Sequence, residues 1–476
     1  MPFSSLLFVC GFLPAFLLVY WAAPARLKNA VALGFSLLFY AWGAPTFLPV
    51  VLGLAAVDTA LAHGIARSTG ARRRKLLLAS GVALHLCVLG YFKYSHFFME
   101  ELQRVLGVLP GSLGLHWARV VLPIGISFIT FEEISYLVDV YRGDAKPARG
   151  WPRYLLFLLL FPHAIAGPIF RWRDLEPQLR ERPHPLDDVL AGCTRFSVGL
   201  AKKVLIANQV AQVADAVFAL PGGQLTPALA WLGAVAYALQ IYFDFSGYSD
   251  MAIGLGRLMG FRFGENFNQP YRAASITEFW RRWHISLSTW MRDYLYVPLG
   301  GNRAGPRRAG MNVLLVFVLS GLWHGASWTF VVWGAYHGVL SLLERVPRVA
   351  SVKSLLPRGV NVALTFVLVV VGWVFFRAGS LEAAGHMLAA MAGVGAGRPM
   401  PLLLHELTSY RAATTFALAL GLVFAPLGWS MAPPVAGSDA RARAWPMAYA
   451  LGPLLLVLAI ASMANSKFSP LIYFRF

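Results

Sequence analysis

Apolar segments long enough to cross a bilayer as a helix, about 20 residues each, recur along this chain of 476 residues. Hydrophobic residues make up 58% of the sequence and Asp, Glu, Lys and Arg only 13%, which is too little polar surface for a soluble protein of this size. The same composition excludes a disordered, collagen-like or disulfide-stapled secreted chain. Three widely separated cysteines in apolar surroundings predict neither a redox nor a zinc site: Cys10, Cys87 and Cys193. We therefore expect an all-α polytopic membrane protein.

The apolar segments predict on the order of ten to twelve spans in one membrane-embedded domain, residues 1–476, because no domain boundary or repeat is visible. Segment 155–170 differs, because it is short, is interrupted by Pro162, Gly167 and Pro168, and has basic residues on both sides. We expect it to be re-entrant, since irregular backbone at membrane depth must be surrounded by protein or line a water-filled cavity. The expected spans are 3–20, 30–48, 49–65, 76–98, 120–140, 204–220, 227–245, 311–343 with a bend near 321–325, 360–376, 412–429 and 445–463.

Basic residues outnumber acidic ones by 41 to 22, which gives a net charge of +19. A nucleic-acid-binding protein would share this charge but not the hydrophobicity, so we expect no nucleic acid partner. The excess is typical of a membrane protein whose basic residues gather in cytoplasmic loops. The clearest cluster is residues 72–75, and no basic residue precedes the first apolar segment, so we expect the N-terminus outside the cytoplasm.

Residues 275–296 carry too many charges to cross a membrane and predict an amphipathic helix. Ser275 and Glu278 have the spacing of a capping box at its start. One face is apolar and aromatic: Phe279, Trp283, Leu287, Trp290 and Tyr294. The opposite face carries Arg281, Ser288 and Arg292, and His284 lies roughly a quarter turn from the apolar centre. We expect this helix to lie in or near the membrane interface, and a simple anchor explains the pattern equally well.

Several ionisable residues fall inside the apolar segments, where an unpaired charge is expensive. Four of them are isolated in the sequence, and hydrogen bonding between helices explains them better than a site does: Asp58, His63, His85 and Lys93. Glu132 and Asp139 are seven residues apart, hence on one helix face, with Glu133 beside them. We expect these acids to pair with basic residues from elsewhere in the chain.

Residues 240–268 contain more polar and small side chains than the apolar segments described above. Asp244 and Asp250 stand close together where an apolar segment ends. Gly254, Gly256 and Gly260 fit neither the dinucleotide fingerprint nor the Walker A spacing, so nucleotide hydrolysis is rejected. We expect these glycines to allow close helix packing or a break in the backbone.

His324 lies in the segment SGLWHGASW, between two glycines and two tryptophans: Gly321, Gly325, Trp323 and Trp328. The glycines permit a bend and let another group approach the imidazole, while the tryptophans supply an apolar wall. Burial favours the neutral ring, which can take a proton at physiological pH. A packed, hydrogen-bonded core histidine is the alternative, and spacing alone slightly favours it. His337 follows 13 residues later, but no HExxH motif or nearby carboxylate completes a ligand set, so we expect no metal.

Five long blocks occur in order along the chain: PIGISFITFEEISYLVDVYRG (123–143), FPHAIAGPI (161–169), QIYFDFSGYSDMAIGLGRLMGFRFGENFNQPY (240–271), SITEFWRRWHISLSTWMRDYLYVPLGG (275–301) and LSGLWHGASW (319–328). Together they resemble the membrane-bound O-acyltransferase superfamily and, within it, the bacterial branch that acetylates alginate. The C-terminal FSPLIYFRF (468–476) is similar as well. The resemblance covers essentially the whole chain.

The resemblance implies a bundle of helices around a central funnel through the bacterial inner membrane, with two histidines near its narrow point, and the charge pattern predicts a periplasmic N-terminus. His324 matches the catalytic histidine of the superfamily, and His284 matches the second histidine of the polysaccharide branch. It further implies transfer of an acetyl group from a cytoplasmic thioester, acetyl-CoA, to an extracytoplasmic polysaccharide. A periplasmic partner protein usually receives or relays the acetyl group, and no tightly bound cofactor is expected.

These roles agree with the chemistry of the side chains. Neutral His324 suits the base that takes the hydroxyl proton, and His284 suits orientation of the acceptor or stabilisation of the oxyanion. Three arginines suit the phosphates of the donor, although contacts with lipid headgroups explain them equally well: Arg281, Arg282 and Arg292. Four further residues are expected to shape the tunnel: Asp244, Asp250, Trp323 and Trp328.

Two alternatives stay open. Relatives that act on peptidoglycan, cellulose or teichoic acid, the last with a D-alanyl group, share the same two histidines, and nothing in the sequence selects the acceptor. A secondary transporter would also have broken helices and intramembrane acids, but such proteins usually show internal repeats, and none is visible here.

Overall fold

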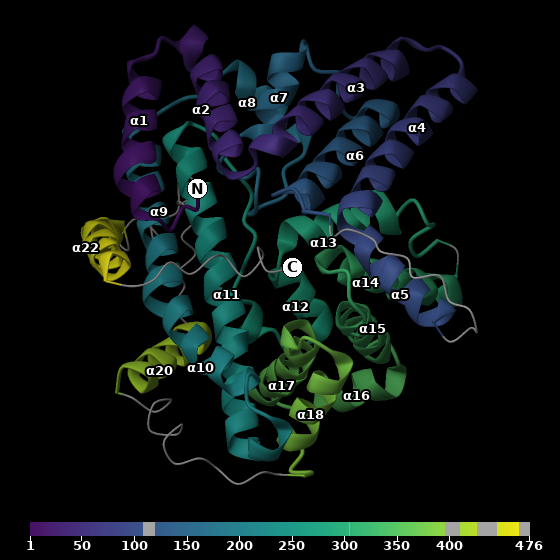
Figure 1. Cartoon of the computed structure of the whole chain (residues 1–476), viewed down its shortest axis with the longest axis vertical. Helices are drawn as coiled ribbons and strands as arrows, with labels where there is room; N and C mark the ends of the chain where they lie inside the picture. Colours follow the sequence, from purple (N-terminus) through teal and green to yellow (C-terminus); the bar gives the residue numbers. More distant parts are fainter. Residues whose placement is uncertain (108–119, 304, 396–409, 426–444, 466–476) are drawn as a thin grey trace. The chain divides into compact units, whose positions relative to one another are not determined.

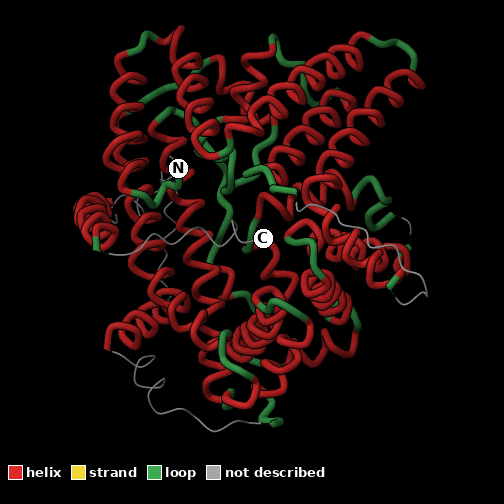
Figure 2. Tube along the Cα trace, in the orientation of Figure 1, coloured by secondary structure: helices red, strands yellow, loops and turns green. Residues whose placement is uncertain are grey.

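The computed structural model describes residues 1–107, 120–303, 305–395, 410–425 and 445–465. Within these ranges the regular elements are helices and no strand occurs (Figure 2), which confirms the predicted all-α fold. They fall into two compact units, one of Met1, Leu7–Pro185 and Met259–Phe263, the other of Pro2–Leu6, Leu186–Leu258 and Gly264–Phe476. The single domain expected for residues 1–476 stays a prediction. The end of the expected span 412–429 and the segment 468–476 lie outside the described residues.

The first unit is built on two antiparallel helices, α3 and α4, joined by a short turn and lying side by side (Figure 1). Helix α6 packs against both, and α7 packs against α2 and α3. The helices of this unit are α1 (Leu13–Ala22), α2 (Lys28–Gly43), α3 (Leu48–Arg67), α4 (Ala71–Leu89), α5 (Ser95–Leu106), α6 (Ile126–Arg142), α7 (Trp151–Leu159) and α8 (Trp172–Arg180).

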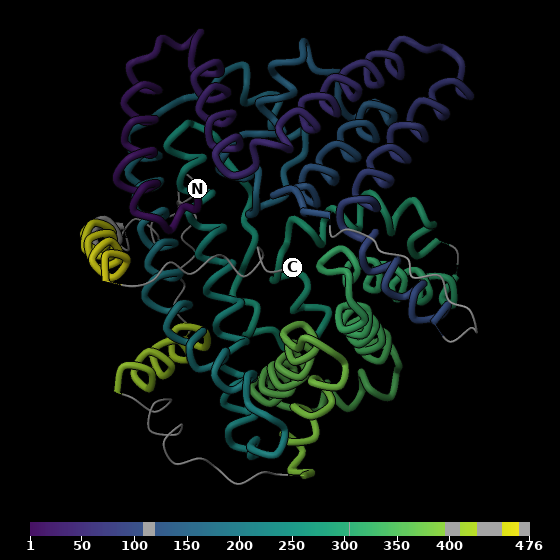
Figure 3. The backbone as a smooth tube through the Cα atoms, in the orientation of Figure 1, coloured from purple at the N-terminus to yellow at the C-terminus, as the bar shows by residue number. Residues whose placement is uncertain are grey.

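The second unit is organised around α11, a helix of 32 residues that packs against α9 and α10 (Figure 3). Helices α14 and α15 form a second close pair, and α17 packs against α15 and α11. The helices of this unit are α9 (Leu186–Ala201), α10 (Asn208–Phe218), α11 (Pro227–Leu258), α12 (Ile276–Arg282), α13 (Ile285–Met291), α14 (Pro306–His324), α15 (Trp328–Leu343), α16 (Pro347–Leu355), α17 (Arg358–Arg377), α18 (Leu381–Met391), α20 (Tyr410–Phe424) and α22 (Trp445–Ala464).

Glycines allow α9 and α11 to approach one another closely. A Cβ atom on Gly254 would lie 2.7 Å from the carbonyl oxygen of Gly192, and one on Gly247 would lie 2.7 Å from the carbonyl oxygen of Gly199. Gly260 follows the end of α11 with a φ of 78°, a conformation that favours glycine. The expectation of close packing at Gly254 and a backbone break at Gly260 is confirmed.

Among the described residues, four helices have the length and apolarity to cross a membrane: Pro45–Arg67, Ala71–Leu106, Pro227–Leu258 and Arg358–Arg377. Four further apolar helices are shorter: Leu7–Ala22, Trp328–Leu343, Tyr410–Phe424 and Ala450–Ala464. The apolar stretch 311–343 bends as expected, because α14 ends at His324 and α15 begins at Trp328. The expected total of ten to twelve spans stays a prediction.

The segment expected to be re-entrant is a short helix followed by buried, irregular chain. Helix α7 ends at Leu159, and the residues from Leu160 to Phe170 that follow are buried. His163 in this stretch places Nδ1 3.0 Å from a carboxylate oxygen of Glu132 on α6. Asp139 on the same helix lies 3.5 Å from Arg173, so both expected pairings of the α6 acids with basic groups are confirmed.

The α9–α11 contact predicts a difference between two Gly→Ala substitutions. Gly254→Ala would push a methyl group into the backbone of α9, and overpacking of this kind costs about 1–3 kcal/mol. Gly421→Ala in α20 is the matched control, because nothing lies within 4 Å of its added Cβ and Ala is the better helix former. We expect the first variant to have a lower unfolding temperature in detergent than the parent. The second variant should show no such decrease. Equal unfolding temperatures would contradict the close contact.

Candidate active site

His324 is the last residue of α14, and the two glycines around it let α15 pack closely. A Cβ atom on Gly321 would collide with the carbonyl oxygen of Phe330, and one on Gly325 would collide with the ring of Phe330. Helix α15 then starts after Ser327, whose hydroxyl accepts a hydrogen bond from the backbone N–H of Thr329 at 3.3 Å. The group that these glycines admit beside His324 is therefore Phe330 of α15.

Three aromatic rings surround the imidazole of His324, which is only 6% exposed. Its centroid lies 4.9 Å from that of Trp323, 5.2 Å from Trp333 and 5.2 Å from Phe376. Trp333 belongs to α15 and Phe376 to α17, and sequence patterns do not single out either residue. Trp328, expected in the tunnel, is 47% exposed, and its role there stays a prediction.

His284 lies at a break in the segment expected to form one helix over residues 275–296. Helix α12 ends at Arg282, α13 starts at Ile285, and a π-helical turn, Arg292–Tyr296, follows. His284 itself has φ 44° and ψ 55°, the left-handed conformation that costs a residue other than glycine about 1–3 kcal/mol. The expectation of a continuous helix is wrong at this point, because the left-handed backbone conformation of His284 interrupts the right-handed helix.

Other features predicted for residues 275–296 are confirmed. The hydroxyl of Ser275 accepts a hydrogen bond from the N–H of Glu278 at 2.9 Å, and the Glu278 carboxylate accepts one from the N–H of Ala274 at 2.7 Å. All five residues of the predicted apolar face are buried. They are covered by protein, since Trp283, for example, lies 4.9 Å from Trp373 of α17. An interfacial position for this segment stays a prediction.

The break brings the two predicted histidines together. The ring centroids of His284 and His324 are 6.5 Å apart, and Trp323 lies 6.4 Å from His284. His284 is fully buried, and Phe245 of α11 packs edge-on against it at 4.7 Å. Burial lowers the pKa of His284 to about 3, so its ring is neutral at physiological pH. Two imidazoles at this separation can both hydrogen bond to one substrate placed between them.

Asn266 contacts His284 and was not singled out by the sequence. It lies in the loop after α11, and its Oδ1 is 3.2 Å from Nδ1 of His284. No motif marks it, because the two residues are 18 positions apart and meet only through the fold.

A cavity of about 210 Å³ lies beside α14, the helix that ends at His324. It is bounded by Ser320, one helical turn before His324, and by Trp280 of α12. Arg292 and Arg345 also line it, and the Arg292 side chain is 63% exposed. The remaining lining is mostly apolar: Leu287, Ser288, Met291, Tyr296, Val313, Val316 and Phe317.

The three arginines predicted to hold donor phosphates do not form one group. Arg292 lines the cavity beside Ser320, whereas Arg281 is exposed on α12. Arg282 pairs with Glu278 at 2.8 Å and lines a second cavity, of about 410 Å³, together with Arg272 and Arg358. Arg345, which the sequence did not indicate, is the arginine that accompanies Arg292.

Asp244 and Asp250 of α11 form buried ion pairs. Asp250 lies 2.6 Å from Arg195 of α9 and 2.6 Å from Lys202, which begins a π-helical turn after α9. Asp244 lies 2.5 Å from Lys203. These contacts join α11 to the chain that follows α9, and the expected tunnel role of the two acids stays a prediction.

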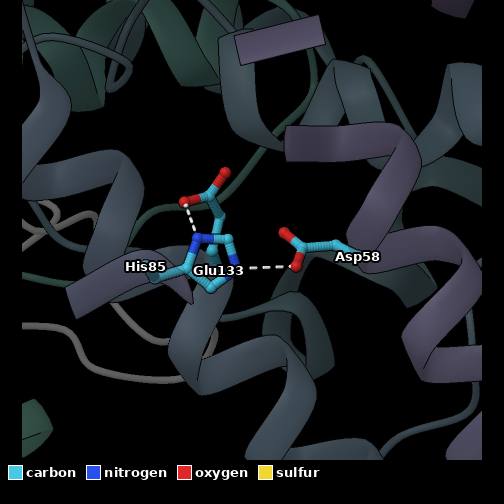
Figure 4. A group of neighbouring side chains, drawn as sticks. All are labelled: Asp58, His85 and Glu133. Atoms are coloured by element: carbon cyan, nitrogen blue, oxygen red, sulfur yellow. Dashed lines mark hydrogen bonds and ion pairs between the residues drawn. The ribbon is translucent and has the colours of Figure 1, made fainter. Parts of the chain in front are cut away.

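A separate buried cluster in the first unit joins α3, α4 and α6 (Figure 4). Nε2 of His85 lies 2.7 Å from Asp58, and its Nδ1 lies 2.8 Å from Glu133. Tyr154 of α7 donates a hydrogen bond to the other Asp58 oxygen at 2.7 Å. The expectation that Asp58 and His85 link helices is confirmed.

These three side chains have the identities of metal ligands, but their geometry favours hydrogen bonds. The imidazole ring stands between the two carboxylates, so each nitrogen faces a different oxygen (Figure 4). Nε2 of His85 makes a hydrogen bond with Asp58 at 2.7 Å, and the 2.8 Å contact of Nδ1 with Glu133 is an ion pair. The cluster of Asp58, His85 and Glu133 is therefore held by one hydrogen bond and one ion pair around the imidazole.

The sequence comparisons agree with this arrangement. The model of the membrane-bound O-acyltransferase family matches residues 147–376, which include both histidines. The chain is 44% identical to the "Probable alginate O-acetylase AlgI" of Azotobacter vinelandii, over 100% of both chains. It is 46% identical to the protein of that name from Pseudomonas aeruginosa, over 89% of this chain and 81% of the relative. It is 35% identical to the "Peptidoglycan O-acetyltransferase" of Helicobacter pylori, over 82% of this chain and 80% of the relative.

The chain belongs to the membrane-bound O-acyltransferase family. It is therefore a membrane enzyme that transfers an acyl group to oxygen, and the resemblance drawn from its sequence blocks is confirmed.

The cluster around His85 predicts a large loss of stability when its imidazole is removed. His85→Ala would leave Asp58 and Glu133 buried without their shared partner, and breaking a buried pair costs about 3–5 kcal/mol. His63→Ala is the matched control, because His63 bonds only to the Thr59 carbonyl of its own helix among the contacts recorded for it. We expect a markedly lower unfolding temperature in detergent for His85→Ala alone. Equal losses in the two variants would contradict the role of the cluster.

Proposed function

We propose that this enzyme transfers the acetyl group of acetyl-CoA from the cytoplasmic side of the inner membrane for O-acetylation of an extracytoplasmic polysaccharide, alginate, with His324 as the base. The observation that carries the proposal is the pair of buried histidines, whose ring centroids are 6.5 Å apart and which are enclosed by aromatic rings. Two relatives at 44% and 46% identity bear the name of alginate O-acetylases, which favours alginate as the acceptor.

The proposed reaction moves the proton of the acceptor hydroxyl and replaces the carbon–sulfur bond of the thioester with a carbon–oxygen bond. His324 takes the proton of the acceptor hydroxyl as its oxygen attacks the carbonyl carbon of the thioester. The carbon–sulfur bond then breaks, and the imidazolium returns the proton to the departing thiolate. A donor for the oxyanion is at hand, because the indole N–H of Trp333 is buried beside His324 and has no hydrogen-bond acceptor among the described residues.

In this proposal the thioester arm of the donor occupies the cavity of about 210 Å³ that Ser320 helps to line. Its apolar lining suits the narrow arm that carries the thioester, and Arg292 and Arg345 at its edge suit the phosphates. Both arginines belong to basic segments that the positive-inside pattern assigns to the cytoplasm. The first apolar helix then starts on the periplasmic side, and a periplasmic partner protein receives or relays the acetyl group.

The alternatives differ in the acceptor or in the class of protein. The 35% identity to a peptidoglycan O-acetyltransferase favours the same chemistry on a different polymer as the second candidate. Cellulose and teichoic acid, the latter with D-alanyl, need the same two histidines. A secondary transporter is disfavoured by the family membership. Acetyl analysis of polymer fractions from one strain separates the acceptors, because only the true substrate loses acetyl groups when the gene is deleted.

The proposed base predicts the outcome of replacing His324. His324→Ala should lower the rate of polymer acetylation about 10²–10⁴-fold, the usual contribution of a general base. His386→Ala, in an exposed position on α18, is the control and should leave acetylation unchanged. The measurement is the acetyl content of the secreted polymer at equal membrane expression. Normal acetylation from the His324 variant would sink the assignment.

The proposed donor cavity predicts that removing its two arginines weakens the binding of acetyl-CoA through its phosphates. Arg292→Gln combined with Arg345→Gln should raise KM for acetyl-CoA by about 10-fold or more, because each charge-assisted hydrogen bond is worth about 1.5–3 kcal/mol. Acetyl-pantetheine, which lacks these phosphates, should be used equally well by variant and parent. Arg281→Gln is the matched control, since Arg281 lines neither cavity. A similar increase in KM with both donors would contradict the proposed contact between these two arginines and the phosphates of the donor.

A further inference from the structure

Asn266 holds the break between α12 and α13 through both its backbone and its side chain. Its carbonyl oxygen accepts a hydrogen bond from the N–H of Ile285 at 3.0 Å. Its side-chain Oδ1 accepts from the N–H of Ser286 at 3.2 Å and from the Ser286 hydroxyl at 2.9 Å. Its Nδ2 donates to the hydroxyl of Ser249 on α11 at 3.2 Å. The side chain is fully buried, so these contacts are shielded from water.

The orientation of the Asn266 amide follows from these partners. The oxygen and nitrogen of an amide look alike in most structures and must be assigned from their hydrogen bonds. The backbone N–H of Ser286 can only donate, so the atom that faces it must be the oxygen. The atom that also faces His284 is therefore Oδ1, a pure acceptor.

This orientation selects one tautomer of His284. Nδ1 of His284 lies 3.2 Å from Oδ1 of Asn266, and an acceptor requires a hydrogen on the opposing nitrogen. A neutral imidazole carries one hydrogen, and burial keeps this ring neutral by lowering its pKa to about 3. With the hydrogen on Nδ1, Nε2 has a lone pair and can only accept.

We infer that Asn266 is a positioning residue that holds His284 in its Nδ1–H tautomer, so that Nε2 accepts a hydrogen bond from the acyl acceptor. This inference rests on the proposed acyl transfer. It separates two roles that the sequence left open for His284, because a lone pair at Nε2 orients the acceptor through a second hydroxyl, next to the one that gives its proton to His324, and cannot donate to an oxyanion. Stabilisation of the oxyanion then falls to other donors, and proton removal stays with His324.

The substitution Asn266→Asp tests this inference with little change in shape. The two side chains have the same number of heavy atoms, and a carboxylate can still accept from Ser286 and from the Ser249 hydroxyl. The carboxylate and His284 then share one additional proton. If it lies on the imidazole, both nitrogens carry hydrogen; if it lies on the carboxyl group facing Nδ1, the tautomer reverses. Nε2 becomes a donor in either case.

The expected result is a new acidic limb in the pH profile of the variant. Transfer from radiolabelled acetyl-CoA to polymer in membrane vesicles should fall about 10-fold for each pH unit below the pKa of the new pair and recover above it. The titratable side chain recorded against the His284 ring is His324 of α14, while α11 contributes Phe245. His324 is present in parent and variant alike, so the ratio of their rates at each pH isolates the new pair.

Asn268→Asp is the matched control, because Asn268 lies in the same loop with an exposed side chain. It introduces the same charge two residues away and should give the parent profile. A merely structural role for Asn266 would lower the rate of Asn266→Asp equally at every pH. If His284 instead donates to the oxyanion, the variant should keep its activity at low pH. Either result would overturn the inference.

Thermal stability provides a readout that does not depend on the proposed function. In the parent, the unfolded chain takes up a proton on His284 below its ordinary pKa of about 6.5, but the folded chain does not, so acidification destabilises. In Asn266→Asp the folded pair keeps its proton, so this destabilisation disappears. The unfolding temperature of the variant relative to the parent should therefore rise as the pH falls from 8 to 5. A constant difference would contradict the hydrogen bond even if the vesicles show no acetyl transfer.

Discussion

A polar group buried among apolar helices must find its partner on another segment of protein, because hydrocarbon offers none. In the first unit this requirement joins three helices through His85, whose two nitrogens bind Asp58 and Glu133. In the second unit it joins α9 to α11 through Arg195 and Asp250. Hydrogen bonds and ion pairs of 2.6–2.8 Å allow little displacement of one helix along its neighbour. A few polar residues therefore act together with the close packing of the helices to fix their register.

The same requirement shapes the active site. Ending α12 at Arg282 and restarting the helix at Ile285 leaves backbone N–H groups that need acceptors. Asn266 supplies one with its carbonyl group and another with its side chain, to Ile285 and Ser286. These hydrogen bonds offset the left-handed conformation of His284. The loop after α11 and the α12–α13 break thus form one structural unit, which positions His284 in the site.

Much of the fold could be predicted from local patterns. The capping box at Ser275, the bend after His324 and the pairing of Glu132 with a basic group all follow from spacing and burial. The break at His284 could not, because WRRWHISLSTW contains neither Gly nor Pro and keeps a helical period. Its cause is a residue 18 positions away. Trp333 and Phe376 were missed for the same reason, since they reach His324 from α15 and α17.

The two histidines are held in different ways, and this difference matches their proposed roles. His284 is held by a hydrogen bond that selects one tautomer and by a backbone conformation that few residues adopt. His324 is enclosed by the rings of Trp323, Trp333 and Phe376, which restrict the plane of the imidazole. A base gains a proton at one nitrogen and loses it again in each turnover, so His324 must present that nitrogen to the acceptor hydroxyl. A residue that only orients the acceptor benefits from being fixed, because an immobile ring lowers the entropy cost of alignment.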